Sequence, residues 1–565
     1  MRAHPVVGAW AGMVIGAALL VGREAAWAQA LPPAALPDVR LEQLPPPSRP
    51  QPPPAVDVPA EAPTRPPVGA SAIRFVLGGL EIEGATAYPP SALVERHRAL
   101  IGTEITLADV YAIAAAIQQF YRRDGYFLSR TIVPAQSIDA GRVRIRVLEG
   151  FIATVVIDGD LGPAESLVRS YLDVVTEQRP IRLATLERAL LLANDVPGVA
   201  VSGLLQPSAS DLGAAELVVS ADRKPFDALF VVDNFGDEFT GEWETAIALS
   251  SNAFTRFGER VTAVGFATNA LNGWDQKVGQ LNTSWRIGGS GLFVETIASY
   301  GNSTPRADLE APGVESRTLL LGASVGYPVV RGRNLNVSVL GGFDFIDSDS
   351  DVFGNERFSR DRLRVAHATA NLDFRDTWRG SSAGSVSLRQ GLPILDATRR
   401  GDDFKSRPNG TGSAGVLRGT VSRLQGLFGD FALFGTASGQ YAFDDLLSDQ
   451  EFNVGGLRFG RGYDQMEISG DHGAGVTAEF QYTRWPGWRF LDSYQVFAFY
   501  DYGRVWSRSD DGLEDSLSST GVGVRLSPIE ELSLDLQVAF PLTRDSQRAN
   551  DGRSPQVLFR AVGRL

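Results

Sequence analysis

The sequence predicts two small α+β modules followed by an all-β transmembrane barrel of ~16 antiparallel strands. Two segments of about 75 residues each carry the same order of strand and helix patterns, which indicates a duplicated module. Helical periodicity disappears after about Phe226, and short alternating strands cut by Gly, Asn, Asp and Ser turns follow. Those roughly 340 residues accommodate ~16 strands at about 21 residues per strand and turn.

The composition excludes several classes of function. A formal net charge of -13 opposes phosphate binding, so nucleic acid is not an expected partner. The absence of Cys removes disulfide frameworks, thiol catalysis and Cys-based zinc sites, and it suits an oxidising compartment. With only 4 His in 565 residues, we expect no metal site, no cofactor and no catalytic residues.

Residues 1–30 have the pattern of a secretory signal peptide. Arg2 supplies a positive charge, Trp10–Val21 is apolar and uncharged, and small residues at 26–30 offer a cleavage site. A membrane anchor is the alternative, but this apolar stretch is shorter than the ~20 residues that a spanning helix needs. We therefore expect the mature chain to leave the cytoplasm.

Residues 31–70 form a Pro-rich linker, with three consecutive prolines at 45–47 and again at 52–54. Such a segment is extended and cannot bury a core. Asp38–Leu44 interrupts the prolines and is long enough for a short helix. It is either a partner-binding helix or part of a loose linker.

The first module is expected at residues 71–150. Thr106 and Asp109 form a capping box that opens a helix, and Gly125 ends it. Apolar Val143, Ile145 and Val147 alternate with Arg142, Arg144 and Arg146, which predicts a strand with one buried and one wet face. The expected elements are a strand at 75–82, helices at 91–100 and from 106, and strands at 127–133 and 143–147.

The second module is expected at residues 151–223 and repeats the same order. Its expected elements are a strand at 155–157, helices at 164–175 and 183–192, and strands at 199–205 and 217–219.

The barrel is expected at residues 224–565. Leu335, Val337 and Val339 alternate with polar Asn336 and Ser338, as they would in a strand between lipid and a wet lumen. The core of a soluble sandwich would give the same alternation. The secretory leader, the length and the aromatic content favour the barrel.

The most informative stretch runs from Glu451 to Glu479. It contains Phe452-Asn453-Val454-Gly455-Gly456, Arg458-Phe459-Gly460-Arg461-Gly462-Tyr463 and Gly470-Asp471-His472-Gly473. This order resembles the signature of the two-partner secretion outer-membrane transporters, the TpsB family that includes ShlB, FhaC and HecB. Further segments that resemble the family are Leu190–Val199, Phe499-Tyr500-Asp501-Tyr502-Gly503, Thr520–Leu526 and Pro541-Leu542.

The resemblance implies a bacterial outer-membrane protein with two periplasmic POTRA modules before its barrel. It implies that these modules capture an unfolded exported partner, an adhesin, haemolysin or toxin with an N-terminal secretion domain, and that the barrel secretes it. It also implies a helix that plugs the pore at rest, for which Asp38–Leu44 is the candidate segment. We expect outer-membrane lipid as a further partner and a monomeric state.

Arg461 is the leading candidate for a functional residue. It lies between two glycines beside Tyr463, and a buried guanidinium needs a carboxylate partner. Asp501 is the candidate partner, because its strand must turn this acid towards the lumen rather than towards lipid. An exposed arginine that meets only solvent is the alternative. The family implies the same pairing, as a latch that holds a long loop inside the barrel. The expected latch residues are Arg461, Gly462, Tyr463, Phe499, Asp501 and Gly503.

Capture of an extended polypeptide is expected to use strand addition, in which the partner pairs with an open sheet edge. Leu217, Val218 and Val219 are the residues that we expect to offer this edge.

Four other patterns have simpler explanations. Gly322–Gly326 matches G-x-S-x-G but lies in an alternating β segment, and Asp347, Asp349 and Asp351 lack the glycine of a calcium loop, so a solvated loop is expected. The other two patterns are histidines scattered along the chain, expected to be ordinary surface or strand residues, and an arginine-rich strand face, expected to be solvated. These residues are His97, His367, His472, Arg142, Arg144 and Arg146.

Three alternatives remain open at this point. A barrel-assembly insertase shares the Arg and Asp motifs, but such proteins usually carry more than two periplasmic modules. A passive porin or surface adhesin explains the barrel but not the duplicated modules. An outer-membrane lipase would require a Ser, a His and a carboxylate that converge at one end of the barrel.

Overall fold

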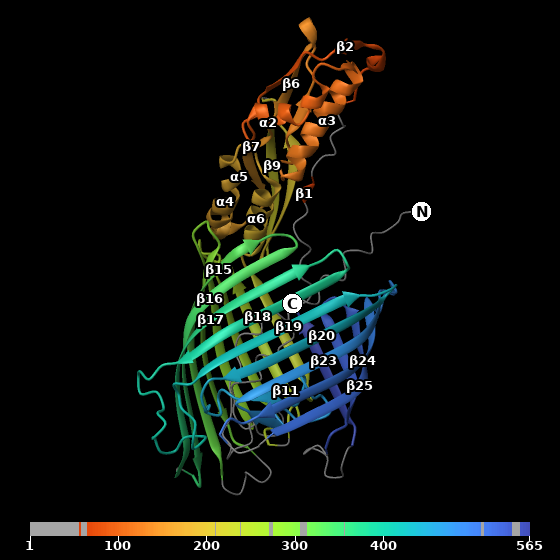
Figure 1. Cartoon of the computed structure of the whole chain (residues 1–565). Helices are drawn as coiled ribbons and strands as arrows, with labels where there is room; N and C mark the ends of the chain where they lie inside the picture. The colour runs from red at the N-terminus through yellow and green to blue at the C-terminus, as the bar shows by residue number, and fades with distance from the viewer. Residues whose placement is uncertain are drawn as a thin grey trace. The chain divides into compact units, whose positions relative to one another are not determined.

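A computed structural model describes residues 56–57, 65–208, 211–237, 239–269, 275–305, 313–354, 356–509, 514–544 and 554–565. The chain divides into an N-terminal unit, Pro53–Lys224, and a unit that contains the barrel and begins its strands after Pro225 (Figure 1). The expected signal peptide and the expected helix at Asp38–Leu44 lie outside the described residues.

The first module contains two small sheets and one long helix. Its sheets have the orders β3-β6-β5 and β2-β4. The elements are β2 (Arg74–Val76), β3 (Gly79–Glu83), α2 (Pro90–Glu95), η6 (Arg98–Leu100), β4 (Glu104–Thr106), α3 (Leu107–Arg123), β5 (Arg130–Ile132) and β6 (Arg142–Leu148). The single strand expected at 75–82 is wrong. The chain turns at Gly78, where a Cβ would lie 2.1 Å from the Ala140 carbonyl oxygen, and this turn sends β2 and β3 into different sheets.

Helix α3 supports this module as expected. The Thr106 hydroxyl accepts from the Asp109 amide, and the Asp109 carboxylate accepts from the Thr106 amide at 2.7 Å, which confirms the capping box. The helix buries Ile113, Ile117 and Tyr121 in the module core. Strand β6 has the expected alternation, because Val143, Ile145 and Val147 are buried and its three arginines are exposed.

The second module packs three helices against a four-stranded sheet. The elements are β7 (Phe151–Asp158), η8 (Gly162–Ala164), α4 (Glu165–Leu172), α5 (Val174–Glu177), α6 (Leu183–Asn194), β8 (Val199–Pro207) and β9 (Ala214–Arg223). The helix expected at 164–175 is divided into α4 and α5 at Asp173. A short strand, β1 (Val56–Asp57), pairs with β8 in parallel.

The open edge expected at Leu217–Val219 is wrong. These residues lie on β9, in a sheet of order β1-β8-β9-β7. Leu217 pairs with Leu205 of β8 on one side and with Val155 of β7 on the other. Its main-chain groups are therefore already used within the sheet. The sequence could not show this, because strand order depends on long-range pairing.

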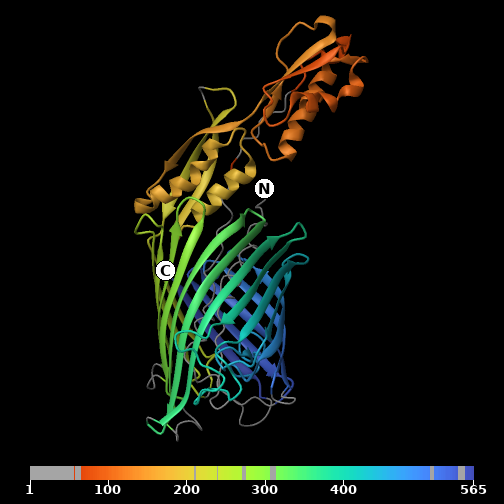
Figure 2. The ribbon, with the colours of Figure 1, turned by 60° about the vertical axis from the view of Figure 1, so that its left-hand side comes forward.

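The second unit is a closed antiparallel barrel of the expected 16 strands (Figure 2). Its first and last strands, β10 and β27, pair and close the cylinder. The first eight strands are β10 (Phe226–Asp233), β11 (Glu244–Asn252), β12 (Arg260–Thr268), β13 (Gln276–Ile287), β14 (Leu292–Ser303), β15 (Glu315–Arg331), β16 (Leu335–Val352) and β17 (Glu356–Arg375). The other eight are β18 (Gly380–Gly391), β19 (Gly415–Gly426), β20 (Phe431–Ala442), β23 (His472–Arg484), β24 (Ser493–Trp506), β25 (Glu514–Ile529), β26 (Leu532–Pro541) and β27 (Gln556–Arg564).

Strand β24 shows how the barrel wall separates its two faces. Phe497, Phe499 and Asp501 point inward and are buried. Tyr500 and Tyr502 point outward and are exposed. This confirms the expected alternation and places the carboxylate on the lumen side of the wall. Among the described helices, none combines the length and the apolarity that a membrane-crossing helix requires.

Candidate functional site

A long connection between β20 and β23, residues 443–471, carries most of the motif residues. It contains a two-stranded sheet of β21 (Phe452–Val454) and β22 (Ile468–Gly470). Apolar residues of this loop pack with Val505 of β24 and Leu517 of β25 in one buried cluster. The loop members of the cluster are Phe452, Val454, Phe459, Tyr463 and Ile468. The loop therefore folds back onto the inner face of the barrel wall.

Glycines on the wall make room for this loop. A Cβ at Gly475 would lie 2.4 Å from the Phe459 ring, and one at Gly503 would lie 2.3 Å from the Val454 side chain. These separations are too short for any real Cβ atom, so larger residues would displace the loop. Gly503, one of the expected latch residues, thus receives a loop side chain.

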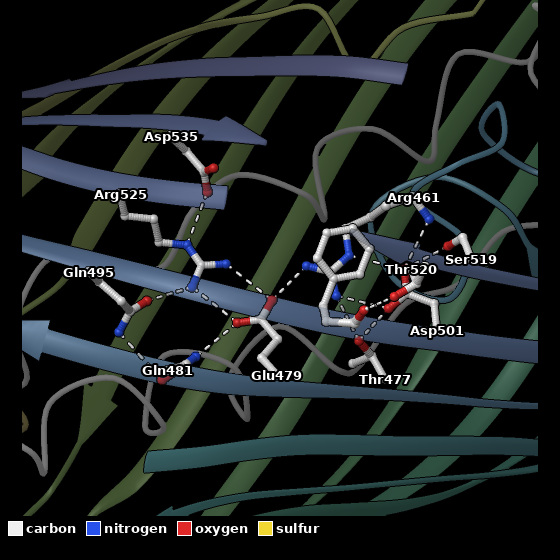
Figure 3. A network of polar contacts seen from close by, with 11 residues as sticks. Arg461, Thr477, Glu479, Gln481, Gln495, Asp501, Ser519, Thr520, Arg525 and Asp535 are labelled. Atoms are coloured by element: carbon white, nitrogen blue, oxygen red, sulfur yellow. Dashed lines mark hydrogen bonds and ion pairs between the residues drawn. The ribbon is translucent and has the colours of Figure 1, made fainter. Parts of the chain in front are cut away.

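Arg461, which lies between β21 and β22 of the loop, meets Asp501 as the sequence indicated. Its Nε donates to Asp501 Oδ2 at 3.0 Å, and its Nη2 donates to Oδ1 at 2.8 Å (Figure 3). The Arg461 amide also donates to Oδ2, at 3.1 Å. Both side chains are buried, so this is a bidentate, desolvated ion pair.

Neighbouring groups fix the geometry of the pair. Thr477 and Ser519 donate their hydroxyls to Asp501 at 2.5 and 3.1 Å, and Arg461 Nη2 lies 3.0 Å from Thr477 Oγ1. The Arg461 guanidinium stacks over the Phe499 ring at 3.5 Å, which gives this expected residue a cation–π role. The wall thus surrounds this one arginine with hydrogen-bond acceptors and an aromatic ring.

A second carboxylate, Glu479 of β23, joins Arg461 to another arginine. Arg461 Nη1 donates to Glu479 Oε1 at 2.6 Å. Arg525 of β25 donates to both Glu479 oxygens, at 3.0 and 3.1 Å, and also to Asp535 at 3.0 Å. Figure 3 shows Glu479 between the two guanidinium groups.

Sequence reasoning missed Glu479, Arg525 and Asp535 as members of the site. Glu479 ends the motif stretch and lies two residues after Thr477, so both side chains are on the same face of the strand. This carboxylate could therefore have been predicted as a member of the site. Arg525 and Asp535 lie opposite each other on neighbouring strands, and only the barrel register brings them to Glu479.

Tyr463 and Gly462 hold the same part of the loop against the wall. The Tyr463 hydroxyl accepts from the Thr543 amide at 2.9 Å and lies 3.2 Å from the Ser518 carbonyl oxygen. A Cβ at Gly462 would lie 2.7 Å from the Pro541 nitrogen, so the backbones approach closely here. All six expected latch residues therefore meet in one region of the lumen.

The G-x-S-x-G segment lies in the middle of β15, where the strand pairs regularly with β14 and β16. Ser324 Oγ lies 3.5 Å from His367 Nε2, and the same nitrogen lies 3.7 Å from Asp344 Oδ2. A catalytic triad uses the two ring nitrogens separately, one towards the nucleophile and one towards the acid. Convergence of these three residues therefore does not give the geometry of a hydrolase.

The solvated loop expected for the three alternating aspartates is wrong. Asp347, Asp349 and Asp351 lie on strand β16. Asp347 pairs with Arg364 at 2.8 Å, whereas Asp349 and Asp351 pair with Arg357 at 2.9 and 3.0 Å. Arginines on β17 thus face each acid, a pairing that only the strand register reveals.

The remaining candidates are structural. His97 lies in the first module, where burial and then the charge of Arg96 lower its pKa. His472 lies at the start of β23 and stacks on Trp506. Arg144 and Arg146 each pair with Glu83 on the neighbouring strand, at 2.9 and 3.0 Å.

Comparison with known proteins supports the resemblance. The family model "Haemolysin secretion/activation protein ShlB/FhaC/HecB" matches residues 213–526, and "POTRA domain, ShlB-type" matches residues 75–150. A similar curated protein is the "Heme/hemopexin transporter protein HuxB" of Haemophilus influenzae, 26% identical over 471 residues, or 80% of each chain. The "Outer membrane transporter CdiB" of Dickeya dadantii is 21% identical over 443 residues, or 76% of this chain and 75% of that protein.

A solved structure shows the same fold. CdiB from Escherichia coli superimposes with a TM-score of 0.73 at 17% sequence identity, over 88% of this chain and 92% of that one.

Proposed function

We propose, from the premise that this chain belongs to the haemolysin secretion/activation protein family ShlB/FhaC/HecB, that Arg461 and Asp501 form the resting-state latch of a protein-conducting pore. The chain is an outer-membrane transporter of two-partner secretion, with periplasmic POTRA modules before its barrel. The observation that carries the proposal is the buried bidentate contact between the loop arginine and the wall aspartate.

A buried ion pair suits a latch because its partial opening is unfavourable. Removal of one partner leaves the other charge buried and uncompensated, at a cost of about 3–5 kcal/mol. The pair therefore either remains closed or opens with entry of water and movement of the loop. When Arg461 leaves, Arg525 stays on Glu479, so Asp501 and Arg461 itself are the charged groups that have to be rehydrated.

The proposed cargo is an unfolded, exported partner protein, an adhesin, haemolysin or toxin. We propose that the POTRA modules bind it by strand addition, which requires no particular side-chain sequence. Within the described part of the second module, β7 is the outermost strand on the side opposite β8. Its outer edge replaces Leu217–Val219 as the proposed docking place.

Three further features complete the proposal. Outward Val496, Tyr500 and Tyr502 of β24 are exposed apolar or aromatic residues, which supports outer-membrane lipid as the partner of the barrel exterior.

We also propose that the transporter acts as a monomer and that it moves its cargo without catalysing a reaction. Folding of the cargo outside the cell would then give the transport its direction.

Secretion of the natural partner tests the latch. The partner is expected to be a large secreted protein encoded beside this chain. Arg461→Ala and Asp501→Ala should each reduce its export at least ~tenfold, and the double variant should be little worse than either, since the two residues share one interaction. Arg504→Ala, on the outward face of the same strand and exposed, is the matched control.

Undiminished export by Arg461→Ala, in a barrel that still folds, would refute the latch. Additive losses in the double variant would show that the two residues act separately. An insertase would instead show defective assembly of other barrels in the variant cells, with export unchanged.

A further inference from the structure

A second buried ion pair lies outside the latch described above. Arg407 belongs to the connection between β18 and β19, residues 392–414, and Asp471 ends the long β20–β23 loop. Arg407 donates to both Asp471 oxygens, through Nη1 to Oδ1 and through Nη2 to Oδ2 at 3.2 Å. Arg407 Nη1 also lies 3.2 Å from Glu451 Oε1. All three side chains are buried.

The connections that carry this pair lie at the outer end of the barrel. The first strand, β10, begins at the periplasmic end, and each following strand reverses direction. The β18–β19 and β20–β23 connections therefore both lie at the opposite end, which is the lower end of the barrel in Figure 1. Arg407 thus joins two outer loops to each other, whereas Arg461 joins one loop to the wall.

Asp471 holds both ends of the long loop. Its Oδ1 accepts from the Leu446 amide at 2.9 Å, near the start of the loop, and Arg407 Nη1 donates to the Leu446 carbonyl oxygen at 2.9 Å. Its Oδ2 accepts from the Arg508 amide at 2.8 Å, in the connection that follows β24. One carboxylate therefore holds three outer connections together, including the one that carries Arg407.

The start of the long loop reaches strands far from β20. Leu447 is buried against Ile346 of β16 and Leu363 of β17, and Asp449 accepts from Ser348 of β16 at 2.8 Å. Strands β17, β18 and β19 separate β16 from β20 in the barrel order. The segment at 446–449 thus connects the end of β20 with β16 across three intervening strands.

The two loops also contact each other beside the ion pair. The Ser448 amide donates to Ser406 Oγ at 3.0 Å, and the Ser406 amide donates to Asp361 of β17 at 3.1 Å. The β18–β19 connection is therefore fixed between the long loop and the wall. Loss of the Arg407 contact would weaken the attachment of both loops at their buried side.

We propose that Arg407 and Asp471 form a second latch, which keeps the β18–β19 and β20–β23 loops together over the outer mouth and must open for a polypeptide to leave. Arg407 is a positioning residue in this scheme, since it acts by holding the loops. The physical basis is that a desolvated ion pair opens as a unit.

Conductance of the purified full chain in a planar lipid bilayer with KCl tests the proposal. Arg407→Gln and Asp471→Asn should each raise the open probability roughly tenfold or more, and the double variant should match the single ones. Arg400→Gln is the matched control, because Arg400 pairs with Asp444 across the same two loops but is exposed. Wild-type gating in Arg407→Gln, or an effect of equal size in Arg400→Gln, would overturn the proposal.

A reversible disulfide between the two loops distinguishes a latch from a purely structural role of Arg407. The chain has no Cys, so Ser406→Cys with Ser448→Cys adds one defined pair of thiols at the loop contact and leaves every charged residue in place. Oxidation should silence the channel in the native and the Arg407→Gln backgrounds, and reduction should restore each; the single-Cys variants are the controls. A channel that opens with equal frequency while the tether is oxidised would overturn the second latch but leave the Arg461 latch intact.

Discussion

At the scale of single residues, the lumen wall uses carboxylates as shared acceptors. Glu479 accepts from Arg461 and Arg525, whereas Asp501 accepts from Arg461 and two hydroxyls. The Arg525 guanidinium also stacks over Phe497 at 3.9 Å. In the proposed latch, Arg525 would therefore keep Glu479 paired in either state of the loop, and Asp501 would be the carboxylate that responds to opening.

Glu479→Gln tests this arrangement. The change keeps the size of the side chain but removes the negative charge between two guanidinium groups. The closed conformation should lose about 3 kcal/mol, and resting KCl conductance should rise accordingly. Glu514→Gln, whose carboxylate pairs with Arg504 at an exposed site, is the control. Conductance equal to that of the native chain would show that the closed loop does not need the shared carboxylate.

Glu149 connects three parts of the first module. Its Oε1 accepts from the Thr86 and Ala87 amides at 2.7 and 2.8 Å and from the Tyr121 hydroxyl at 2.7 Å. Burial raises the pKa of this carboxyl, but the hydrogen bonds from Ala87, Thr86 and Tyr121 outweigh it, and the net pKa lies below its ordinary value of 4.5. The folded module therefore favours the ionised form.

The sign of the pH dependence follows from this shift. Because the folded pKa is depressed, the stabilisation is fully present above pH 4.5 and is lost as the pH falls through the folded pKa. Glu149→Gln should cost about 1–3 kcal/mol and flatten this dependence. Hydrogen exchange of α3 amides in the full chain measures both effects. If the variant loses stability at low pH to the same extent as the native chain, groups other than Glu149 cause the pH dependence.

At the scale of elements, large side chains of the loop pack against glycines of the barrel wall. Phe452, Phe459 and Val454 face Gly473, Gly475 and Gly503, and a Cβ at any of the three glycines would lie within 2.4 Å of a loop side chain. Strands β23 and β24 therefore carry recesses that receive the small sheet of β21 and β22. The wall glycines Gly473, Gly475 and Gly503 are thus explained by packing against the loop.

Gly503→Ala should displace the loop without a change in charge. The new methyl group would overlap Val454, so the variant should show raised conductance and reduced export while the barrel still folds. Gly279→Ala is the control, because a Cβ at Gly279 of β13 has nothing within 4 Å. A variant that gates and exports like the native chain would show that the wall accommodates the methyl group.

At the scale of the whole molecule, the closure of the barrel depends on few contacts between its first and last strands. The β10–β27 register pairs Leu229–Asp233 with Arg560–Arg564, a shorter ladder than that of β10 with β11. Asn234 extends it, because its Nδ2 donates to the Val557 carbonyl oxygen at 2.9 Å and its Oδ1 accepts from the Phe559 amide at 2.6 Å. A side chain thus continues the ladder after the strand ends.

Asn234→Ala should weaken this closure by about 1–3 kcal/mol, the value of two hydrogen bonds. The temperature at which the folded barrel loses its compact electrophoretic mobility should fall, and Asn302→Ala, at an exposed position of β14, should leave it unchanged. Equal transition temperatures in the two variants would show that the β10–β27 pairing alone determines closure.

Local patterns account for most of what the sequence predicted correctly. The capping box of α3 and the alternation in β6 and β24 each follow from a few adjacent residues, and length alone limited the number of barrel strands. The Arg461–Asp501 contact was found because a buried cation demands an anion, because the strand of Asp501 turns this acid towards the lumen, and because the family resemblance implies the same pairing. A contact within the site could be predicted from the sequence where a buried charge in one segment required an oppositely charged partner.

Strand order and register could not be predicted from the sequence. The edge expected at Leu217–Val219 is the interior of a sheet. Asp347, Asp349 and Asp351 of β16 face arginines that lie on another strand. Arg407 and Asp471 are 64 residues apart and meet only because two outer loops fold over the same mouth. The sequence by itself determined the periodicity, the fold class and the charge that had to be neutralised, because these depend on neighbouring residues. The tertiary structure alone decided which distant groups neutralise that charge, because the pairing follows from the closure of the barrel and the path of its loops.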